Sequence, residues 1–345
     1  MEFGTGCVKV TPAHDVNDYE VGKRHDLEFI TIFDEDGILN EECGEFKGQE
    51  RLESREPVMA KLEVEGFVEK VEDYENQVGH CYRCKNVVEP YISKQWFVKS
   101  EIADGAIEKV NNHLAEFYPA HWINSFNAWM KELRDWCISR QRDWGVPIAF
   151  FRDKTTGQPI YDEKVLKFIV MIFEQKGAHA WWDMEFSELL YPGSGYDPAN
   201  LEKVMDILDV WFDSGSTWKA VLKSRNYDAG NYPASMYLEG SDQHRGWFQS
   251  SLLVSTASQG HAPYTSILTH GFTVDEKGEK MSKSKGNVVA PSDIAKQYGV
   301  EIMRLWVGHS DYTTDLKISD NIIKQVGEQY RKIRNTFRFL LASVD

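Results

Sequence analysis

Residues 271–287 read Gly-Phe-Thr-Val-Asp-Glu-Lys-Gly-Glu-Lys-Met-Ser-Lys-Ser-Lys-Gly-Asn, and the interpretation of the whole chain starts from them. They place four lysines within nine residues, with two serines between them and two glycines beside them: Lys277, Lys280, Lys283, Lys285, Ser282, Ser284, Gly278 and Gly286. Glycines let a backbone come close to a ligand, and hydroxyl and ammonium groups suit phosphate oxygens. Flexible lysines can also follow charge that moves during phosphoryl or nucleotidyl transfer. The plain alternative is a solvated basic turn.

The bulk composition limits the class of protein. With 345 residues, of which 42% are hydrophobic and 27% charged, the chain is long enough for two or three domains with real cores. No apolar run approaches the ~20 residues of a membrane helix, and no signal peptide opens the sequence. Five cysteines, two of them in one Cys-x-x-Cys, fit a reduced compartment. A net charge of −15 excludes general nucleic-acid binding, so any RNA contact needs a local basic patch.

We expect residues 1–80 to form a compact α/β module. Hydrophobic periodicity and turn residues predict its elements in order. They are a strand at 4–10, a helix that Asp18 caps and that runs through Tyr19, Val21 and Arg24, a hairpin turn at 34–37, a helix at 54–66 and a strand at 67–71.

Cys81 and Cys84 form a tight Cys-x-x-Cys knuckle. That spacing supplies two thiolates to one tetrahedral zinc ion. Neither Cys7 nor Cys43 is an obvious completing ligand, so a pair of half-buried cysteines remains the alternative.

Residues 91–148 combine aromatic and basic side chains. Tryptophans in such a run are usually core residues. Arg134, Arg140 and Arg142 lie close together in sequence and could bring guanidinium groups near a phosphate or a 3′ terminus. Residues 149–205 look like an insertion with a helix at 164–174.

Two further blocks carry polar residues at the ends of expected strands. Residues 208–216 begin as a strand and turn at Ser214-Gly215, and residues 237–248 run from strand through polar loop to a helix at 248–258. Such a junction gathers polar groups at the carboxyl edge of a parallel sheet, where open α/β folds bind ligands. Helix capping and surface polarity are the alternative for Asp242 and His244.

The C-terminal part is expected to be helical. Pro291 and Ser292 are helix start signals, residues 301–309 form an apolar stretch, and a long amphipathic helix follows. The basic residues of that last helix indicate either a solvent face of a bundle or a surface that meets tRNA.

Lys280-Met281-Ser282-Lys283-Ser284 matches letter for letter the KMSKS signature of class I aminoacyl-tRNA synthetases, with His270-Gly271-Phe272 ten residues before it. Over nearly its whole length the chain resembles the isoleucyl-tRNA synthetases. The stretches that carry the resemblance are residues 135–148, Trp181-Trp182-Asp183, residues 209–216 and residues 239–248.

The resemblance implies roles for individual residues. Lys280 and Lys283 would be catalytic and steady the leaving pyrophosphate, and Trp211 and Gln243 would line the isoleucine pocket. Glu239 and Asp242 would hold the ribose of the adenylate, and His270 and Gly271 would lie beside the adenine. The full set of residues that would bind ATP and the adenylate is Glu239, Gly240, Asp242, His270, Gly271, Met281, Ser282 and Ser284.

Residues 1–80 resemble the second half of the editing domain, which hydrolyses tRNA that carries the wrong amino acid. Asp18 matches the aspartate that grips the mischarged amino group. Nine residues before it stands Lys9, where isoleucyl enzymes usually carry histidine. Residues 8–22 are closer to valyl-tRNA synthetases, which leaves the edited substrate open.

The expected fold class is α/β, with the second half of a class I Rossmann-like nucleotide-binding fold. The resemblance divides the chain into residues 1–90 of the editing domain, residues 91–290 of the catalytic domain with the insertion at about 149–205, and residues 291–345 at the start of a helical bundle. No His-Ile-Gly-His-like signature occurs. We therefore expect a piece of a longer protein that carries half of each active site and is inactive alone.

The expected function is ATP-dependent attachment of isoleucine to tRNA(Ile) through an isoleucyl-adenylate, with editing of mischarged tRNA. The expected cofactors are ATP with Mg²⁺ and zinc, the partners are tRNA and isoleucine without a membrane, and the location is the cytoplasm. One alternative is a valyl-tRNA synthetase, which residues 1–30 favour and residues 135–285 disfavour. Another is a non-catalytic tRNA-binding paralogue. The intact residues 271–287, here called the lysine loop, and the intact Glu239-x-x-Asp242-Gln243 disfavour it.

Overall fold

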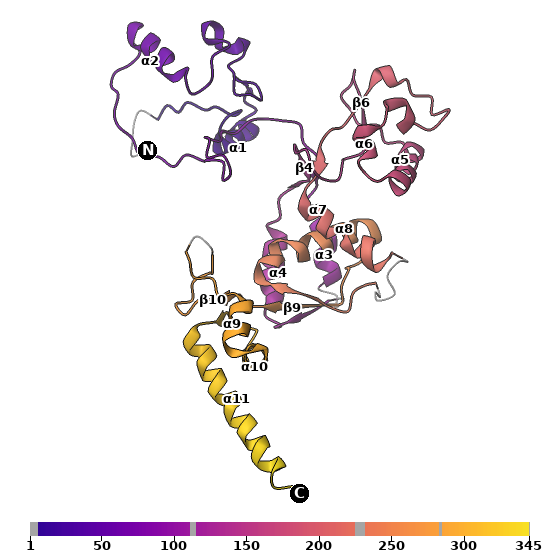
Figure 1. Ribbon diagram of the computed structural model, residues 1–345. Helices are drawn as coiled ribbons and strands as arrows, with labels where there is room; N and C mark the ends of the chain where they lie inside the picture. The colour runs from indigo at the N-terminus through magenta and orange to yellow at the C-terminus, as the bar shows by residue number, and fades with distance from the viewer. Residues whose placement is uncertain (1–5, 111–114, 225–231, 283–284, 345) are drawn as a thin grey trace. The chain divides into compact units, whose positions relative to one another are not determined.

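The computed structural model describes residues 6–110, 115–224, 232–282 and 285–344, and the chain divides into two compact units, Met1–Lys94 and Gln95–Asp345 (Figure 1). Helices and a parallel sheet occur together, so the expected α/β class is confirmed. Among the helices that the structure describes, none is long and apolar enough to cross a membrane.

The first unit consists of short helices joined by long loops. Its elements are α1 (Val16–His25), the 3₁₀ helix η1 (Glu41–Phe46) and α2 (Arg55–Val64). The hairpin turn at 34–37 is confirmed, because Phe33 bridges Leu39 and the amide of Asp34 donates to Ile38 O at 2.9 Å. The helix expected at 54–66 is also confirmed, as α2.

The cap of α1 differs from the sequence prediction. Asp15, rather than Asp18, is the N-cap, and its carboxylate accepts hydrogen bonds from the amides of Asn17 and Asp18 at 2.8 and 2.9 Å. Asp18 lies in the first turn of the helix. Both positions suit an acidic side chain near a helix N-terminus, and sequence spacing does not separate them.

Two strand predictions in this unit are wrong. Residues 67–71 are irregular, and so are residues 6–10 of the strand predicted at 4–10. Residues 4 and 5 lie outside the described part of the chain. Val8 is 78% exposed and Phe67 74% exposed, so these apolar side chains pack against no core. A strand needs a neighbour to pair its backbone groups, and a local alternation of residues does not supply one.

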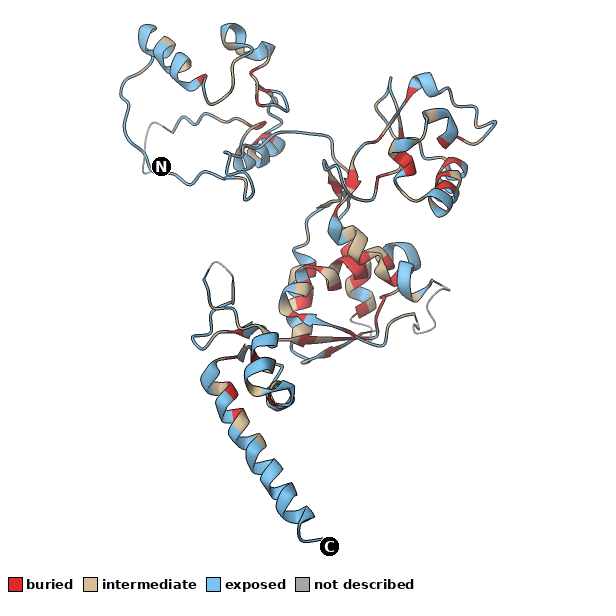
Figure 2. Ribbon diagram, in the orientation of Figure 1, coloured by how far each residue is buried: buried red, intermediate tan, exposed pale blue. Residues whose placement is uncertain are grey.

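The second unit is built around a three-stranded parallel sheet. Its strands lie in the order β2 (Glu116–Tyr118), β9 (Ser266–His270), β8 (Tyr237–Gly240). The helices α3 (Ile102–Lys109), α4 (Trp122–Lys131) and α8 (Trp247–Gln259) pack on it. Their shared core is red in Figure 2 and contains Ala106, Phe117, Phe126, Met130, Tyr237, Phe248, Leu252 and Ile267. The helix expected at 248–258 is confirmed as α8.

The second unit also contains separate antiparallel pairs: β1 (Phe97–Val98) with β3 (Trp136–Cys137), and β4 (Ser139–Arg140) with β7 (Ile207–Leu208). The strand expected from residue 208 ends there. Asp209 caps the helix α7 (Val210–Gly215), so the turn predicted at Ser214-Gly215 is wrong. The π-helix η5 (Trp218–Leu222) follows α7.

The segment 149–205 has its own core. It contains β5 (Phe151–Asp153) paired with β6 (Leu201–Lys203), the helices α5 (Glu163–Lys176) and α6 (Ala180–Asp183), and the 3₁₀ helices η3 (Phe186–Leu189) and η4 (Pro198–Asn200). The helix expected at 164–174 is confirmed as α5, which the side chain of Asp162 caps. Fully buried Trp181 lies at the centre of this core.

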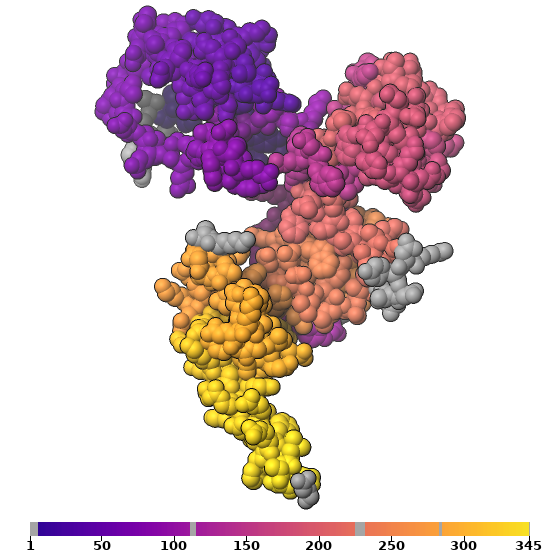
Figure 3. Space-filling model, viewed as in Figure 1, coloured from indigo at the N-terminus to yellow at the C-terminus, as the bar shows by residue number. Residues whose placement is uncertain are grey.

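The C-terminal part contains β10 (Thr273–Val274) paired in parallel with β11 (Leu316–Lys317), and the helices α9 (Pro291–Tyr298), α10 (Val300–His309) and α11 (Asp320–Leu341). The predicted helix start at Pro291 is confirmed. Ile323 and Val326 of α11 are buried against α9 and α10, whereas Phe337 and Leu340 are exposed. In Figure 3 none of the described elements covers the C-terminal half of α11, in yellow, on the face in view.

His244 lies in the core of the parallel sheet and should set part of the pH dependence of stability. The residue is 1% exposed, its Nε2 lies 2.9 Å from Thr269 Oγ1, and its ring stacks on Trp122 with 4.8 Å between centroids. Burial lowers the pKa of His244 to about 4. Because the unfolded imidazole titrates near ~6.5, the stability that the neutral ring contributes is complete above that pH and is lost as the pH falls toward 4.

The free energy of unfolding, measured with urea, should fall in both proteins when the pH is lowered from 7 to 4.5. We expect this fall to be about 2 kcal/mol smaller in His244→Gln than in the parent protein. His309→Gln, at an exposed position of α10, is the control and should behave as the parent does. Equal losses in the parent and in His244→Gln would show that the buried imidazole does not control acid stability.

Candidate functional site

The carboxyl ends of β8 and β9 bring six of the predicted site residues together. Glu239 pairs with Thr269 and Gly240 with His270 at the ends of the two strands. Asp242 and Gln243 follow at once in the 3₁₀ helix η6 (Ser241–Arg245), and Gly271 follows His270. Since this edge of a parallel sheet is where open α/β folds bind ligands, the arrangement favours a ligand site here.

Two glycines at this edge have close neighbours, which are backbone atoms at Gly271 and side chains at Gly240. A Cβ atom on Gly271 would lie 2.1 Å from the carbonyl oxygen of Thr314, and the amide of Gly271 donates to Tyr312 O at 2.8 Å. A Cβ atom on Gly240 would lie 3.0 Å from both Asp242 Oδ1 and the ring of Phe272. Gly271 therefore docks the strand end against residues 312–315, and no larger residue fits there.

Trp211 and Gln243 meet around Gly246. A Cβ atom on Gly246 would lie 2.7 Å from Gln243 Oε1 and 3.0 Å from the ring of Trp211. Gln243 Oε1 also accepts a hydrogen bond from the amide of Trp247 at 2.9 Å, which orients the side-chain amide. The two residues predicted to share a pocket are thus close to each other.

Trp247 also belongs to this site, although no sequence pattern singled it out as a site residue. Its indole stacks on Tyr237 at 4.0 Å, and its Nε1 donates to Ser214 O in α7 at 2.9 Å. Trp247 therefore links the sheet to the helix that carries Trp211. The one sequence feature that could have indicated Trp247 is its position within residues 239–248, a stretch that carries the family resemblance.

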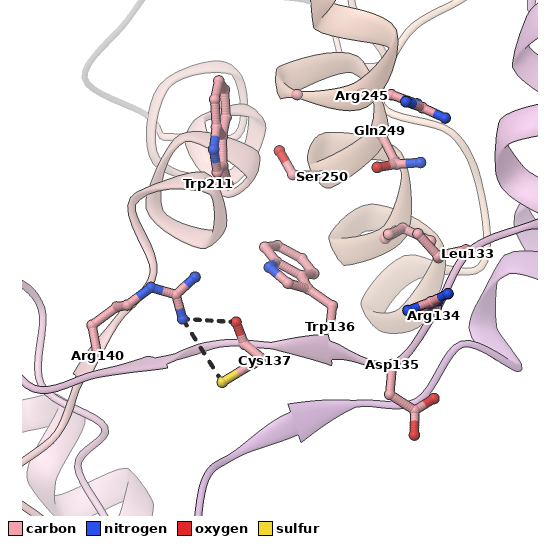
Figure 4. Close-up of a pocket in the computed structure, with 12 residues that line it drawn as sticks. Leu133, Arg134, Asp135, Trp136, Cys137, Arg140, Trp211, Arg245, Gln249 and Ser250 are labelled. Atoms are coloured by element: carbon pink, nitrogen blue, oxygen red, sulfur yellow. Dashed lines mark hydrogen bonds between the residues drawn. The ribbon is translucent and has the colours of Figure 1, made fainter. Parts of the chain in front are cut away.

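A cavity of about 400 Å³ lies between β3, α7 and α8 (Figure 4). Its walls combine indole rings with cationic and amide groups, among them Arg134, Trp136, Arg140, Trp211, Arg245 and Gln249. The guanidinium of Arg245 also lies 5.1 Å from the ring centroid of Trp129. Mixed apolar and polar walls of this kind suit a small organic ligand.

The three arginines of residues 134–142 are placed differently from one another. Arg134 and Arg140 line the cavity, whereas Arg142 is exposed and does not. Arg140 forms an ion pair with Asp209, and its Nη1 donates to Cys137 O at 2.9 Å and to Ser139 O at 2.7 Å. Both of its Nη groups therefore already have partners within the protein. That these arginines contact a phosphate or a 3′ terminus stays a prediction.

Asp213, in α7, is a carboxylate with an unusual environment. Burial, together with the negative charge of Asp209, raises the pKa of Asp213 to about 6. The carboxyl of Asp213 thus gains a proton just below neutral pH, next to the residues that hold Trp211.

The lysine loop is closed by hydrogen bonds between its two ends. Asp275 Oδ1 accepts from the amides of Lys277 and Glu279 at 3.0 and 2.8 Å, and Asn287 Nδ2 donates to Asp275 Oδ2 at 2.8 Å. Asn287 Oδ1 accepts from the amide of Ser282 at 2.9 Å. The hydrogen bond from Asn287 is the main reason that the pKa of Asp275 lies below its usual value.

Lys280 and Met281 of the KMSKS signature each contact a neighbouring element. Lys280 Nζ lies 5.9 Å from the ring centroid of Phe272, close to the end of β9. Met281 packs against the core formed by α9, α10 and α11, which ties the loop to the C-terminal helices. Lys283 and Ser284, predicted to contact ATP, lie outside the described residues.

In the first unit, Asp18 is engaged by its own chain. Its Oδ2 accepts hydrogen bonds from the amide of Thr11 at 2.7 Å and from Thr11 Oγ1 at 3.1 Å, and Lys9 Nζ lies 3.4 Å from Thr11 Oγ1. Lys9 and Asp18 are therefore neighbours through Thr11, and this geometry alone permits a purely structural role for the carboxylate.

Cys81 and Cys84 lie on a tight turn in which the amide of Lys85 donates to Cys81 O at 2.9 Å and Lys85 has a φ of 65°. Within the described ranges, no group of three or more His, Cys, Asp or Glu side chains is placed to hold a metal ion. The two thiols could thus supply half of a tetrahedral site.

Residues 14–319 match the family described as tRNA synthetases class I (I, L, M and V), which confirms the expected resemblance. The chain is 57% identical over 358 residues to an isoleucine--tRNA ligase of a Nitratiruptor species, and 55% identical over 368 residues to that of Campylobacter curvus. Each comparison covers 100% of this chain and 39% of the relative, so the chain spans about two fifths of the length of these relatives.

Among solved structures, a Mycobacterium tuberculosis methionyl-tRNA synthetase in complex with methionyl-adenylate is similar with a TM-score of 0.47 and 19% identity. The similarity covers 72% of this chain and 40% of that one. Similarity at this level adds nothing to the sequence comparison.

We expect Asn287 to hold the lysine loop closed. Asn287→Ala removes the bonds to Asp275 and Ser282, and a loss of ~1.4 kcal/mol of local stability corresponds to about 10-fold faster amide exchange at Ser282. Hydrogen exchange of residues 275–282 measures this directly. Glu276→Gln, on the exposed side of the same loop, should leave exchange unchanged. Exchange as slow in Asn287→Ala as in the parent would mean that other contacts close the loop.

Proposed function

The chain belongs to the class I tRNA synthetases, and from this membership we propose that it serves the ATP-dependent attachment of isoleucine to tRNA(Ile) through an isoleucyl-adenylate. One observation supports the proposal above all. The KMSKS residues Lys280 and Met281 follow a strand end at which Glu239, Asp242 and His270 are already gathered. The 57% identity to an isoleucine--tRNA ligase favours isoleucine as the amino acid.

We propose that the ATP site lies at the ends of β8 and β9. Glu239 and Asp242 are exposed or near the surface and would accept hydrogen bonds from ribose hydroxyls, while His270 and Gly271 would lie beside the adenine. A side chain at Gly240 would crowd Asp242 and Phe272, so the glycine leaves space beside the proposed ribose ligand. Mg²⁺ would accompany the triphosphate, whose oxygens suit it as ligands.

The lysine loop would act on charge that develops as the adenylate forms. In that step the carboxylate oxygen of the amino acid bonds to the α-phosphorus of ATP, and pyrophosphate leaves with the electron pair of the broken bond. Lys280 and Lys283 would stabilise that negative charge, assisted by Met281, Ser282 and Ser284. Because the charge appears mainly in the transition state, these lysines should affect rate more than amino-acid affinity.

Trp211 and Gln243 would form part of the amino-acid pocket, with Trp247 supporting them. The ring of Trp211 faces Gly246, and Gln243 is oriented by the amide of Trp247. An apolar wall separates isoleucine from valine by only about 1–3 kcal/mol. An editing step is therefore physically expected.

The proposed function is tested by ATP–pyrophosphate exchange in a full-length protein that contains this chain. We expect exchange with isoleucine to exceed exchange with valine by about 10- to 200-fold in kcat/KM. Lys283→Ala should lower kcat by about 10²- to 10³-fold, the scale for losing one preorganised charge donor, and leave the KM for isoleucine nearly unchanged. Lys277→Ala, outside the signature, is the control.

Each alternative predicts a different result. Stronger exchange with valine would identify a valyl-tRNA synthetase, and no exchange with either amino acid would identify a non-catalytic paralogue. Normal exchange in Lys283→Ala would mean that the loop is only a solvated turn.

For residues 1–90 we propose a part in editing, with residues 91–290 serving activation and residues 291–345 beginning a bundle that meets tRNA. Asp18 would anchor the ammonium group of a misplaced amino acid, with Lys9 nearby. The contacts of Asp18 with Thr11 would then orient the carboxylate for this purpose.

Asp18→Ala and Asp18→Asn distinguish anchoring from a structural role. The asparagine keeps an oxygen that can accept from the Thr11 amide but carries no charge. We expect both variants to lose about 100-fold in deacylation of mischarged tRNA, because a charge-assisted contact is lost, and to keep normal isoleucine activation. Deacylation that survives in Asp18→Asn but not in Asp18→Ala would make Asp18 structural.

We propose that Cys81 and Cys84 supply two thiolates of a zinc site that other residues complete. The two cysteines lie two residues apart before a tight turn at Lys85, a spacing that suits two ligands of one tetrahedral ion. We also place the protein in the cytoplasm, where thiols stay reduced and tRNA is charged.

A further inference from the structure

Arg140 is bound from three sides by its own chain. Its Nη1 donates to the carbonyls of Cys137 and Ser139 at 2.9 and 2.7 Å, and its Nη2 pairs with Asp209 Oδ2. The guanidinium thus joins β3 and β4 to the residue that precedes α7. Figure 4 shows it beside Cys137, at the edge of the cavity that Trp211 also lines.

Asp209 uses both of its carboxylate oxygens. While Oδ2 faces Arg140, Oδ1 accepts a hydrogen bond from the amide of Trp211 at 2.7 Å and so caps α7. The backbone amide of Asp209 donates to Ile138 O at 2.7 Å. The position of Trp211 is therefore fixed through one carboxylate, two residues away from it in sequence.

This carboxylate depends on Arg140. The side chain of Asp209 is 6% exposed, whereas that of Arg140 is 41% exposed, so the acid is the partner that lacks water. Removing the arginine would leave a buried negative charge next to Asp213, which is an unfavourable arrangement. The carboxylate would then turn toward solvent, which weakens the cap on α7.

We propose that Arg140 is a positioning residue for the amino-acid pocket, which holds Trp211 in place through Asp209. This inference rests on the proposed function, because it takes Trp211 as a wall of the isoleucine site. It differs from a role at phosphate or at the tRNA 3′ terminus, in which Arg140 would act only when tRNA is present.

The first test needs no catalytic activity. Hydrogen exchange at the Trp211 amide should be about 10-fold faster or more in Arg140→Gln than in the parent, since its acceptor is loosened. Arg142→Gln is the matched control, because Arg142 belongs to the same basic run but is exposed and lies outside the cavity lining. Unchanged exchange at Trp211 in Arg140→Gln would overturn the inference whether or not the protein activates isoleucine.

The second test is tRNA-free ATP–pyrophosphate exchange in a full-length protein that contains this chain. We expect Arg140→Gln to raise the KM for isoleucine about 10-fold or more, with kcat changed less than about 3-fold, because a displaced pocket wall weakens binding. Arg140→Lys keeps a cation for Asp209 but loses the fork to the two carbonyls, so its KM should fall between those of the parent and Arg140→Gln.

The outcomes distinguish a failure of the proposed function from a failure of the positioning role of Arg140. A parent protein that activates no isoleucine would contradict the proposed function, and the exchange of the Trp211 amide would still decide the role of Arg140. Normal tRNA-free activation with a loss only in tRNA charging would overturn the positioning role in favour of a tRNA contact. An equal fall in kcat and in kcat/KM would also overturn it.

Discussion

The parallel pairing of β8 with β9 is the constraint on which the candidate site depends. It puts Glu239 beside Thr269 and Gly240 beside His270, and thereby brings residues from two distant blocks of sequence to one edge. The aromatic core below fixes this register, since His244 reaches from η6 to Thr269 while its ring stacks on Trp122. The polar residues at this edge are therefore held in place by the packing of the neighbouring core.

A second layer of contacts connects this edge to the neighbouring elements. Trp247 spans from Tyr237 in the sheet to Ser214 in α7, and Asp209 caps α7 from the other end. In the C-terminal part, Asn287 closes the lysine loop while Met281 anchors it to the C-terminal helices. The amino-acid side and the nucleotide side of the proposed site are therefore supported by different parts of the second unit.

Much of this arrangement could be predicted from the sequence, and the failures have a common physical cause. Helices were predicted well where a local signal starts or ends them, as Pro291 does for α9 and as the helical spacing of 54–66 does for α2. The strand at 67–71 failed because strand formation depends on a partner that the local pattern does not contain. The ion pair of Arg140 with Asp209 joins residues far apart in sequence, so no spacing rule could have indicated it. The contacts of Asn287 with Ser282 and Asp275 are local, but they depend on how the loop folds back on itself, which a pattern of residue types does not specify.

The close approach of Gly271 to Thr314 limits how this fold can vary. Because the glycine has no room for even one more carbon, the strand end and residues 312–315 form a single fitted joint. The amide of Phe272 donates to Asp315 Oδ1 at 2.8 Å and closes the same joint from its other side. A chimaera that exchanges the lysine loop with that of a relative must therefore carry both halves of the joint, since a foreign loop would meet a surface shaped for another partner.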